Sequence, residues 1–214
     1  MNTIFSWFVR ITGFIAYLPV FRPKYYFVNR KKQDRRIKGR AIVVSNHRSV
    51  FDFMTMLYLF PTRTLRCIVA ELMFEKNFIM TAMLKGFGAI RVDRNSHDFA
   101  FLGQAMEVLA RGGAVEIYPE SRIPNQGEEI PLPFKPSAVY LALQSEAPII
   151  PVYTNGKYFT KSRLRAIVGE PIDVRELYCP EQSESENVER ITELLRERII
   201  DLGKQLEEKT EKKK

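Results

Sequence analysis

The 214-residue sequence predicts an α/β fold: a central mixed, mainly parallel sheet flanked by helices, with an N-terminal membrane-interface helix. Short apolar runs that contain β-branched residues alternate with longer helical patterns, which is typical of parallel strands joined by helices. An apolar segment rich in aromatic residues precedes these runs. The length suits one domain with a substantial core and an appended segment.

The first expected element is a helix over residues 4–21, about 27 Å long at the usual rise and slightly short of a bilayer core. Arg10 in its middle and Pro19 near its end disfavour a simple spanning helix. A cleavable signal peptide is disfavoured because no basic region precedes the run. We expect a helix that lies in the membrane interface, with a core helix of the domain as the alternative.

A cationic segment follows the apolar one. Its basic residues are Arg22, Lys24, Arg30, Lys31, Lys32, Arg35, Arg36, Lys38 and Arg40. An apolar anchor followed by positive charge is the two-signal arrangement that attaches proteins to anionic membranes. The net charge of +8 would also suit nucleic acid, but the aromatic residues are not interleaved with the charge as a stacking platform requires. We therefore expect anionic membrane lipids as partners and no nucleic acid.

Six short apolar runs are expected to form strands. They span residues 41–45, 66–70, 88–92, 114–118, 148–153 and 164–169. Helices are expected over residues 53–60, up to residue 84, over 96–111, over 137–144 and, with an amphipathic pattern, over 187–206. The chain thus divides into a membrane-association segment (1–24), a main domain (25–208) and a disordered basic tail (209–214).

The segment SNHRSVFD places His47 and Asp52 in a loop after the first predicted strand of the domain. A carboxylate bonded to one imidazole nitrogen raises the basicity of the other, which suits a general base for a hydroxyl substrate. Functional sites in α/β sheets gather beyond the carboxyl ends of strands, which favours this role. The spacing alone also fits a loop histidine and a helix-capping aspartate. Ser45 or Ser49 as a covalent nucleophile is disfavoured because neither lies in a G-x-S-x-G turn.

Cysteine and histidine are scarce. Cys67 and Cys179 form no CxxC pair, and the sequence holds only two histidines. This content predicts neither a disulfide framework nor a metal site, and it is consistent with a reducing compartment.

The segment NHRSVFD resembles the NHxxxxD motif of the glycerolipid acyltransferases, specifically the 1-acylglycerol-3-phosphate acyltransferases. Further blocks similar to that family's follow in its order: GAIRVDR (88–94), YPESRIP (118–124), FKPSA (134–138) and APIIPVY (147–153). The resemblance covers roughly residues 38–171. Several ordered blocks make it far more specific than a single motif.

The resemblance implies that His47, supported by Asp52, deprotonates an acceptor hydroxyl that attacks acyl-CoA or acyl-carrier protein. Lysophosphatidate would be the acceptor and phosphatidate the product, with no cofactor besides the acyl donor. The enzyme would lie on the cytoplasmic face of the membrane, peripheral or monotopic. The alternatives are another acceptor (glycerol-3-phosphate, another lysophospholipid or a lyso-amino lipid) or a non-catalytic basic protein that binds lipid or nucleic acid.

The resemblance also implies a set of substrate-binding residues: Asn46, Arg94, Glu120, Arg122 and Lys135. Arg94, Arg122 and Lys135 would hold the acceptor phosphate, since guanidinium groups bind phosphate oxygens in pairs and lysine adds a point charge. Surface ion pairing is their alternative role. Glu120 would orient the glycerol oxygens, and Asn46 would help to shape the loop.

Two positions depart from the family pattern. In the third block Ser121 replaces the glycine of F-P-E-G-T-R, and Arg122 comes one residue earlier than the family's arginine. Glycine permits left-handed backbone, so we expect this turn to change. Ser137 replaces the glycine of F-K-x-G-A. Both departures lie on the acceptor side of the expected site, so they bear on which acceptor is used.

Overall fold

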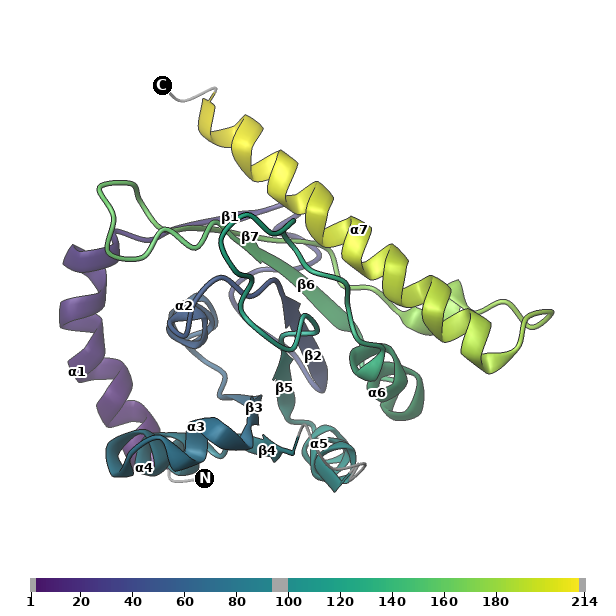
Figure 1. The fold of residues 1–214 in the computed structure, drawn as a ribbon, viewed down its shortest axis with the longest axis horizontal. Coiled ribbons are helices and arrows are strands. Elements are labelled where there is room, and N and C mark those ends of the chain that lie inside the picture. Colours follow the sequence, from purple (N-terminus) through teal and green to yellow (C-terminus); the bar gives the residue numbers. More distant parts are fainter. Residues whose placement is uncertain (1–2, 94–99, 212–214) are drawn as a thin grey trace.

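The computed structural model describes residues 3–93 and 100–211 and shows a seven-stranded sheet with the order β1-β7-β6-β2-β5-β3-β4 (Figure 1). The strands are β1 (Lys24–Phe27), β2 (Ala41–Ser45), β3 (Leu65–Ala70), β4 (Ile90–Val92), β5 (Ala114–Ile117), β6 (Ile149–Thr154) and β7 (Arg165–Val168). Neighbouring strands are parallel except β6 and β7. The predicted mixed, mainly parallel α/β fold is confirmed.

Helices cover both faces of the sheet. They are α1 (Thr3–Phe21), α2 (Asp52–Leu59), α3 (Glu71–Glu75), α4 (Phe78–Phe87), α5 (Ala100–Ala110), α6 (Ser137–Ser145), the 3-10 helix η1 (Val174–Leu177) and α7 (Glu184–Glu211). In Figure 1, α5, α6 and α7 lie on one side of the sheet and α1 and α2 on the other. Helix α7 continues to Glu211, three residues into the predicted tail, and residues 212–214 lie outside the described part.

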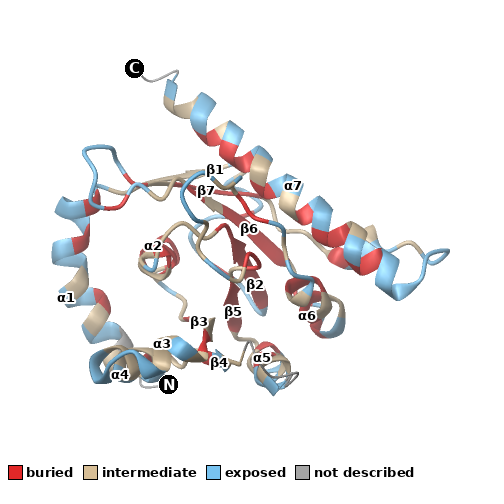
Figure 2. Ribbon diagram, viewed as in Figure 1, coloured by how far each residue is buried: buried red, intermediate tan, exposed pale blue. Residues whose placement is uncertain are grey.

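Strand β2 is buried on both faces (Figure 2). Ile42 and Val44 pack with α5, α6 and α7, whereas Ala41 and Val43 pack under α2. Successive side chains of a strand point to opposite faces, so a continuous apolar run is what this central position requires. Each fully buried valine or isoleucine side chain contributes about 1.5–3 kcal/mol relative to an exposed one.

Strand β1 was not predicted, because its four residues KYYF lie within the basic segment, where charge is the main feature and the short run YYFV (25–28) was overlooked. Tyr25 and Phe27 nevertheless pack against the apolar cluster under α2. The strand pairs in parallel with β7 and extends the sheet by one edge. Aromatic residues suit a half-buried edge strand, which explains how so short a run is accommodated.

Some of the basic residues that the sequence assigned to a membrane surface form bonds with other parts of the protein itself. Lys32 pairs with Glu170 at 2.7 Å. Arg35 donates to the carbonyl oxygens of Tyr58 and Leu59 at the end of α2, where helical carbonyls have no partner in the helix. These charges stabilise the fold, and their attraction to anionic lipid stays a prediction.

Helix α1 has two unlike faces. Arg10 is buried and donates to the carbonyl oxygens of Leu57 (2.5 Å) and Arg63 (2.7 Å), and Tyr17 stacks on Tyr58 at 4.3 Å between ring centroids. On the opposite face the large apolar side chains are exposed; they include Trp7, Phe8, Ile11, Ile15 and Leu18. No helix within the described ranges has both the length and the apolarity to cross a bilayer.

Candidate active site

His47 and Asp52 meet at the carboxyl end of β2. The strand ends at Ser45, and Asp52 is the first residue of α2. Nδ1 of His47 lies 2.8 Å from Oδ2 of Asp52. The Asp52 side chain is fully buried, whereas 21% of the His47 side chain is exposed. The structure therefore brings the two predicted catalytic residues together, with the histidine on the accessible side.

The Asp52 carboxylate has partners at both oxygens. The backbone N–H groups of Arg48 (2.6 Å) and Ser49 (2.8 Å) donate to Oδ2. The Tyr158 hydroxyl donates to Oδ1 at 2.8 Å and also lies 2.6 Å from Oγ1 of Thr55. Burial raises the pKa of Tyr158 well above its ordinary value, so this hydroxyl stays a donor. The carboxylate is thus fixed, and its position in the first turn of α2 also suits its charge.

This geometry decides which nitrogen of His47 can act as the base. A proton on Nδ1 is held by the Asp52 carboxylate, so the free lone pair is on Nε2. The carboxylate also stabilises the imidazolium that forms when Nε2 takes a proton. The pair is suited to general-base chemistry on a hydroxyl group.

Two tyrosines at this site were not predicted. The ring of Tyr118 stacks on the imidazole of His47, with 4.5 Å between centroids and 23° between planes. Tyr158 binds Asp52 from a loop 106 residues further along the chain. Tyr118 lies inside the YPESRIP block, so its place in a motif could have marked it as a residue of the site. Tyr158 follows the block that ends at Tyr153, and no motif marks it.

Asn46 and Glu120 support the loop of His47. The Asn46 side chain donates to the Thr154 carbonyl at 3.0 Å and accepts from the Thr154 N–H at 2.8 Å. One Glu120 oxygen accepts from the His47 N–H at 2.6 Å, and the other accepts from the Leu132 N–H at 2.7 Å. Both side chains are buried. These bonds favour a supporting role over direct contact with the acceptor, which stays a prediction for both residues.

The turn after Glu120 contains a left-handed residue. Ser121 has φ of 62°, in the region that glycine adopts most easily, and its N–H donates to the Tyr118 carbonyl at 3.0 Å. The expected change from a glycine-containing turn stays a prediction; the left-handed conformation itself is present here. Serine occupies it, at the energetic cost that a side chain has in this region.

The three predicted phosphate-binding residues have different surroundings. Arg122 is exposed and forms a two-pronged ion pair with Glu128, at 2.6 and 2.7 Å. This pairing raises the pKa of Arg122 and lowers that of Glu128 to about 2. Lys135 is exposed, and its backbone N–H donates to the Pro119 carbonyl at 2.9 Å. Arg94 lies outside the described residues.

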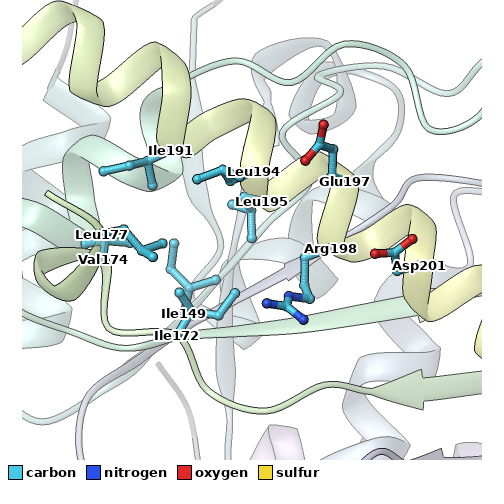
Figure 3. Close-up of a pocket in the computed structure, with 10 residues that line it drawn as sticks. All are labelled: Ile149, Ile172, Val174, Leu177, Ile191, Leu194, Leu195, Glu197, Arg198 and Asp201. Atoms are coloured by element: carbon cyan, nitrogen blue, oxygen red, sulfur yellow. The ribbon is translucent and has the colours of Figure 1, made fainter. Parts of the chain in front are cut away.

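A cavity of about 250 Å³ lies between α7, η1 and the start of β6 (Figure 3). Apolar side chains form most of its wall, and charged residues of α7 lie at one side. Ile149, the first residue of β6, lines the cavity, whereas Thr154, the last residue of β6, is bonded to Asn46. The cavity is therefore at the end of β6 remote from His47, and we assign it no part in the site.

The chain is similar to 1-acyl-sn-glycerol-3-phosphate acyltransferase beta of Homo sapiens, with 30% identity over 184 residues that cover 79% of this chain and 62% of the human protein. It is 28% identical over 148 residues to the 1-acyl-sn-glycerol-3-phosphate acyltransferase of Limnanthes alba, covering 67% of this chain and 50% of the plant protein. The chain thus spans less than two thirds of the length of either relative.

The fold is similar to the crystal structure of the 1-acyl-sn-glycerophosphate (LPA) acyltransferase, PlsC, from Thermotoga maritima. The TM-score is 0.66 at 21% identity, and the match covers 92% of this chain and 79% of that one. The acyltransferase family model matches residues 24–155, more than half of the 214 residues, including His47 and Asp52. This chain therefore belongs to the acyltransferase family.

Proposed function

We propose that this protein transfers a fatty acyl group from acyl-CoA or acyl-carrier protein to the free hydroxyl of lysophosphatidate, giving phosphatidate. The observation that carries the proposal is the His47–Asp52 pair, in which Asp52 binds Nδ1 and leaves Nε2 to the substrate. The names of the similar human and plant proteins support the choice of acceptor.

The reaction needs one base and no covalent acyl–enzyme. Nε2 of His47 takes the hydroxyl proton while the hydroxyl oxygen attacks the thioester carbonyl carbon. The carbon–sulfur bond then breaks, and the leaving thiolate takes the proton back from the imidazolium. Ser45 is buried, and Oγ of Ser49 accepts from the Phe51 N–H; among the described residues neither hydroxyl is bonded to Nε2 of His47, the contact that would activate a serine nucleophile.

The acceptor phosphate would bind the exposed cations beside this centre. Arg122 lies two residues after Glu120, whose carboxylate binds the backbone of His47. Lys135 is placed nearby because its N–H bonds to Pro119 in the same turn. A phosphate that bound Arg122 would replace the Glu128 carboxylate, which now occupies the guanidinium. We include Arg94 in this set from its position in the second motif block.

The exposed apolar face of α1 would bind the enzyme to a membrane. Trp7, Ile11 and Ile15 lie on this face, opposite the buried Arg10 and Tyr17. Changing Trp7, Ile11 and Ile15 to serine should reduce flotation with vesicles that contain anionic lipid. A variant with Tyr178→Ser and Leu194→Ser, exposed apolar residues elsewhere, is the control. Equal flotation of both variants and wild type would refute attachment through α1.

An acceptor panel with one labelled acyl thioester tests the reaction. Lysophosphatidate should be acylated faster than glycerol-3-phosphate or an uncharged lysolipid. His47→Ala should lower the rate by ~10²–10⁴, the usual loss with a general base. His97→Ala, the other histidine of the sequence, is the matched control. Activity retained in His47→Ala would overturn the mechanism, and binding without turnover in wild type would favour a non-catalytic lipid-binding protein.

A further inference from the structure

We propose that Tyr118, anchored by the buried carboxyl of Glu116, is a positioning residue that sets the plane of the His47 ring. The inference rests on the proposed function, since it concerns how the base is held. The Asp52 bond holds Nδ1 of His47, but a single hydrogen bond bends easily, so the ring can still rock about its Cβ–Cγ bond. A second contact limits this rocking and so narrows the direction of the Nε2 lone pair. The Tyr118 ring supplies it, at 4.5 Å and 23° from the imidazole.

Glu116 is an unusual residue for its place in the fold. It lies in β5, between β2 and β3, and is in register with Val43 on one side and Cys67 on the other. Its side chain is buried in the sheet, where apolar residues are expected in a parallel strand. A buried carboxyl is costly unless it is hydrogen-bonded. The hydrogen bond that the Glu116 carboxyl makes therefore has to account for its burial.

That bond is with Tyr118. The Tyr118 hydroxyl donates to Oε1 of Glu116. Tyr118 directly follows the last residue of β5, and its hydroxyl reaches back to Glu116 two residues earlier. Burial raises the pKa of Glu116 to about 8, so near neutrality most molecules hold the proton and no net charge is placed beside the histidine. The pair therefore acts as a neutral anchor, which ties the far end of the tyrosine ring to the centre of the sheet.

The arrangement holds the imidazole from two directions. Asp52 contacts its edge from α2, and Tyr118 covers one of its faces from the end of β5. The acceptor hydroxyl must then reach Nε2 in the plane that Tyr118 sets. Small errors in such an orientation lower the rate of a general-base reaction much more than they lower substrate binding.

Kinetics and NMR of two variants test the proposal. Tyr118→Leu removes the ring and should lower kcat by ~10- to 100-fold, with KM for both substrates close to wild type. The double variant Glu116→Leu/Tyr118→Phe keeps the ring and removes both polar groups, a change that usually preserves stability. Its kcat should fall less than that of Tyr118→Leu. Tyr153→Leu, the same change at a β6 tyrosine packed against α7, is the control.

NMR separates positioning from a general loss of structure. The sequence has two histidines, so His97→Gln assigns the imidazole signals of His47. The stacked ring should move these signals upfield in wild type and in the double variant, and Tyr118→Leu should abolish that displacement while the fold is retained. Wild-type kcat in Tyr118→Leu, or a loss no larger than in Tyr153→Leu, would overturn the proposal.

Two further outcomes are decisive. Wild-type kcat in the double variant would refute the anchoring role of Glu116. If wild type shows no acyl transfer, the proposed function fails, but the His47 signals still report whether Tyr118 holds the ring.

Discussion

The loop of His47 and the turn that follows Glu120 lie side by side, yet they are built in opposite ways. Around His47, buried polar groups bind one another or backbone amides; Asn46, Asp52 and Glu120 have partners at every side-chain oxygen. In the turn, Arg122 is exposed, and its partners among the described residues are the Glu128 carboxylate and, at 3.5 Å, the Ile123 carbonyl; Lys135 is also exposed.

Under the proposed function, this difference would separate the groups that carry out the reaction from those that select the acceptor. A buried network holds one geometry, because breaking any of its bonds leaves a buried polar group without a partner. Exposed charges are weakly held and can exchange one anion for another. We therefore expect variants of the first region to lose turnover, and variants of the second to change acceptor use while turnover is kept and stability changes little.

Asp52→Asn is the strongest test of the buried region. The amide keeps the shape of the side chain but cannot stabilise an imidazolium at His47, so kcat should fall by ~10²–10⁴. Steady-state kinetics will show this, with Asp201→Asn on the exposed face of α7 as the control. A kcat close to wild type would remove the distinction between the two regions.

Glu116→Gln tests how the buried Glu116 carboxyl affects the free energy of unfolding as the pH changes. The Glu116 pKa is about 8 in the folded protein, against an ordinary value of 4.5, so the folded protein keeps a proton that the unfolded chain loses between these values. Stability from this group therefore falls as the pH rises from 4.5 to 8. From pH 4.5 to pH 8 the free energy of unfolding of the variant should therefore rise relative to that of wild type by on the order of several kcal/mol, since one pKa unit corresponds to about 1.4 kcal/mol.

Urea unfolding of both proteins at pH 5 and pH 8 measures this gain. Glu128→Gln is the comparison from the exposed turn, because the Glu128 pKa of about 2 lies below the tested range. Parallel pH dependence in wild type and Glu116→Gln would show that the buried carboxyl does not titrate as we infer.

Tyr158→Phe removes the hydroxyl that donates to Oδ1 of Asp52 and keeps the ring packed against Phe21. A hydrogen bond to a charged group contributes about 1.5–3 kcal/mol, so kcat should fall by roughly tenfold or less and the free energy of unfolding by a similar energy. Tyr178→Phe, an exposed tyrosine at the end of η1, is the control. An unchanged kcat would mean that the backbone amides of Arg48 and Ser49 suffice to hold the carboxylate.

The sequence predicted the sheet best where strands are buried on both faces. The run Ala41–Ser45 was predicted to the residue, because a central strand must be apolar throughout. Strand β1 was missed because an edge strand needs only part of its surface buried, and its short run YYFV (25–28) is flanked by basic residues on both sides. The single charge of α1, Arg10, predicted that the helix does not span a membrane, but not that it binds the end of α2.

At the site, the sequence predicted the one pair of residues that are close together in the chain. His47 and Asp52 are five residues apart, so a bend of the chain between them is enough to bring their side chains into contact. Tyr158 comes from a loop beyond β6, and its contact with Asp52 depends on the whole sheet. The sequence also does not show which groups a side chain contacts. Glu120 was predicted to orient the glycerol oxygens of the acceptor, which stays a prediction, but the bonds of its two oxygens to backbone amides were not predicted.

The smallest effect should come from Glu128→Gln, which tests the exposed region alone. The neutral amide leaves Arg122 free for the acceptor phosphate, so KM for lysophosphatidate should fall by about two- to fivefold. The kcat and the KM for the acyl thioester should stay unchanged, and the unfolding midpoint should fall slightly, because the lowered Glu128 pKa means that its charged form stabilises the fold. Glu129→Gln, an adjacent acid paired with Arg196 instead, is the matched control. A higher KM, or equal effects of both variants, would mean that Arg122 with Glu128 shapes the turn. The acceptor phosphate would then have to be held by Lys135 and Arg94.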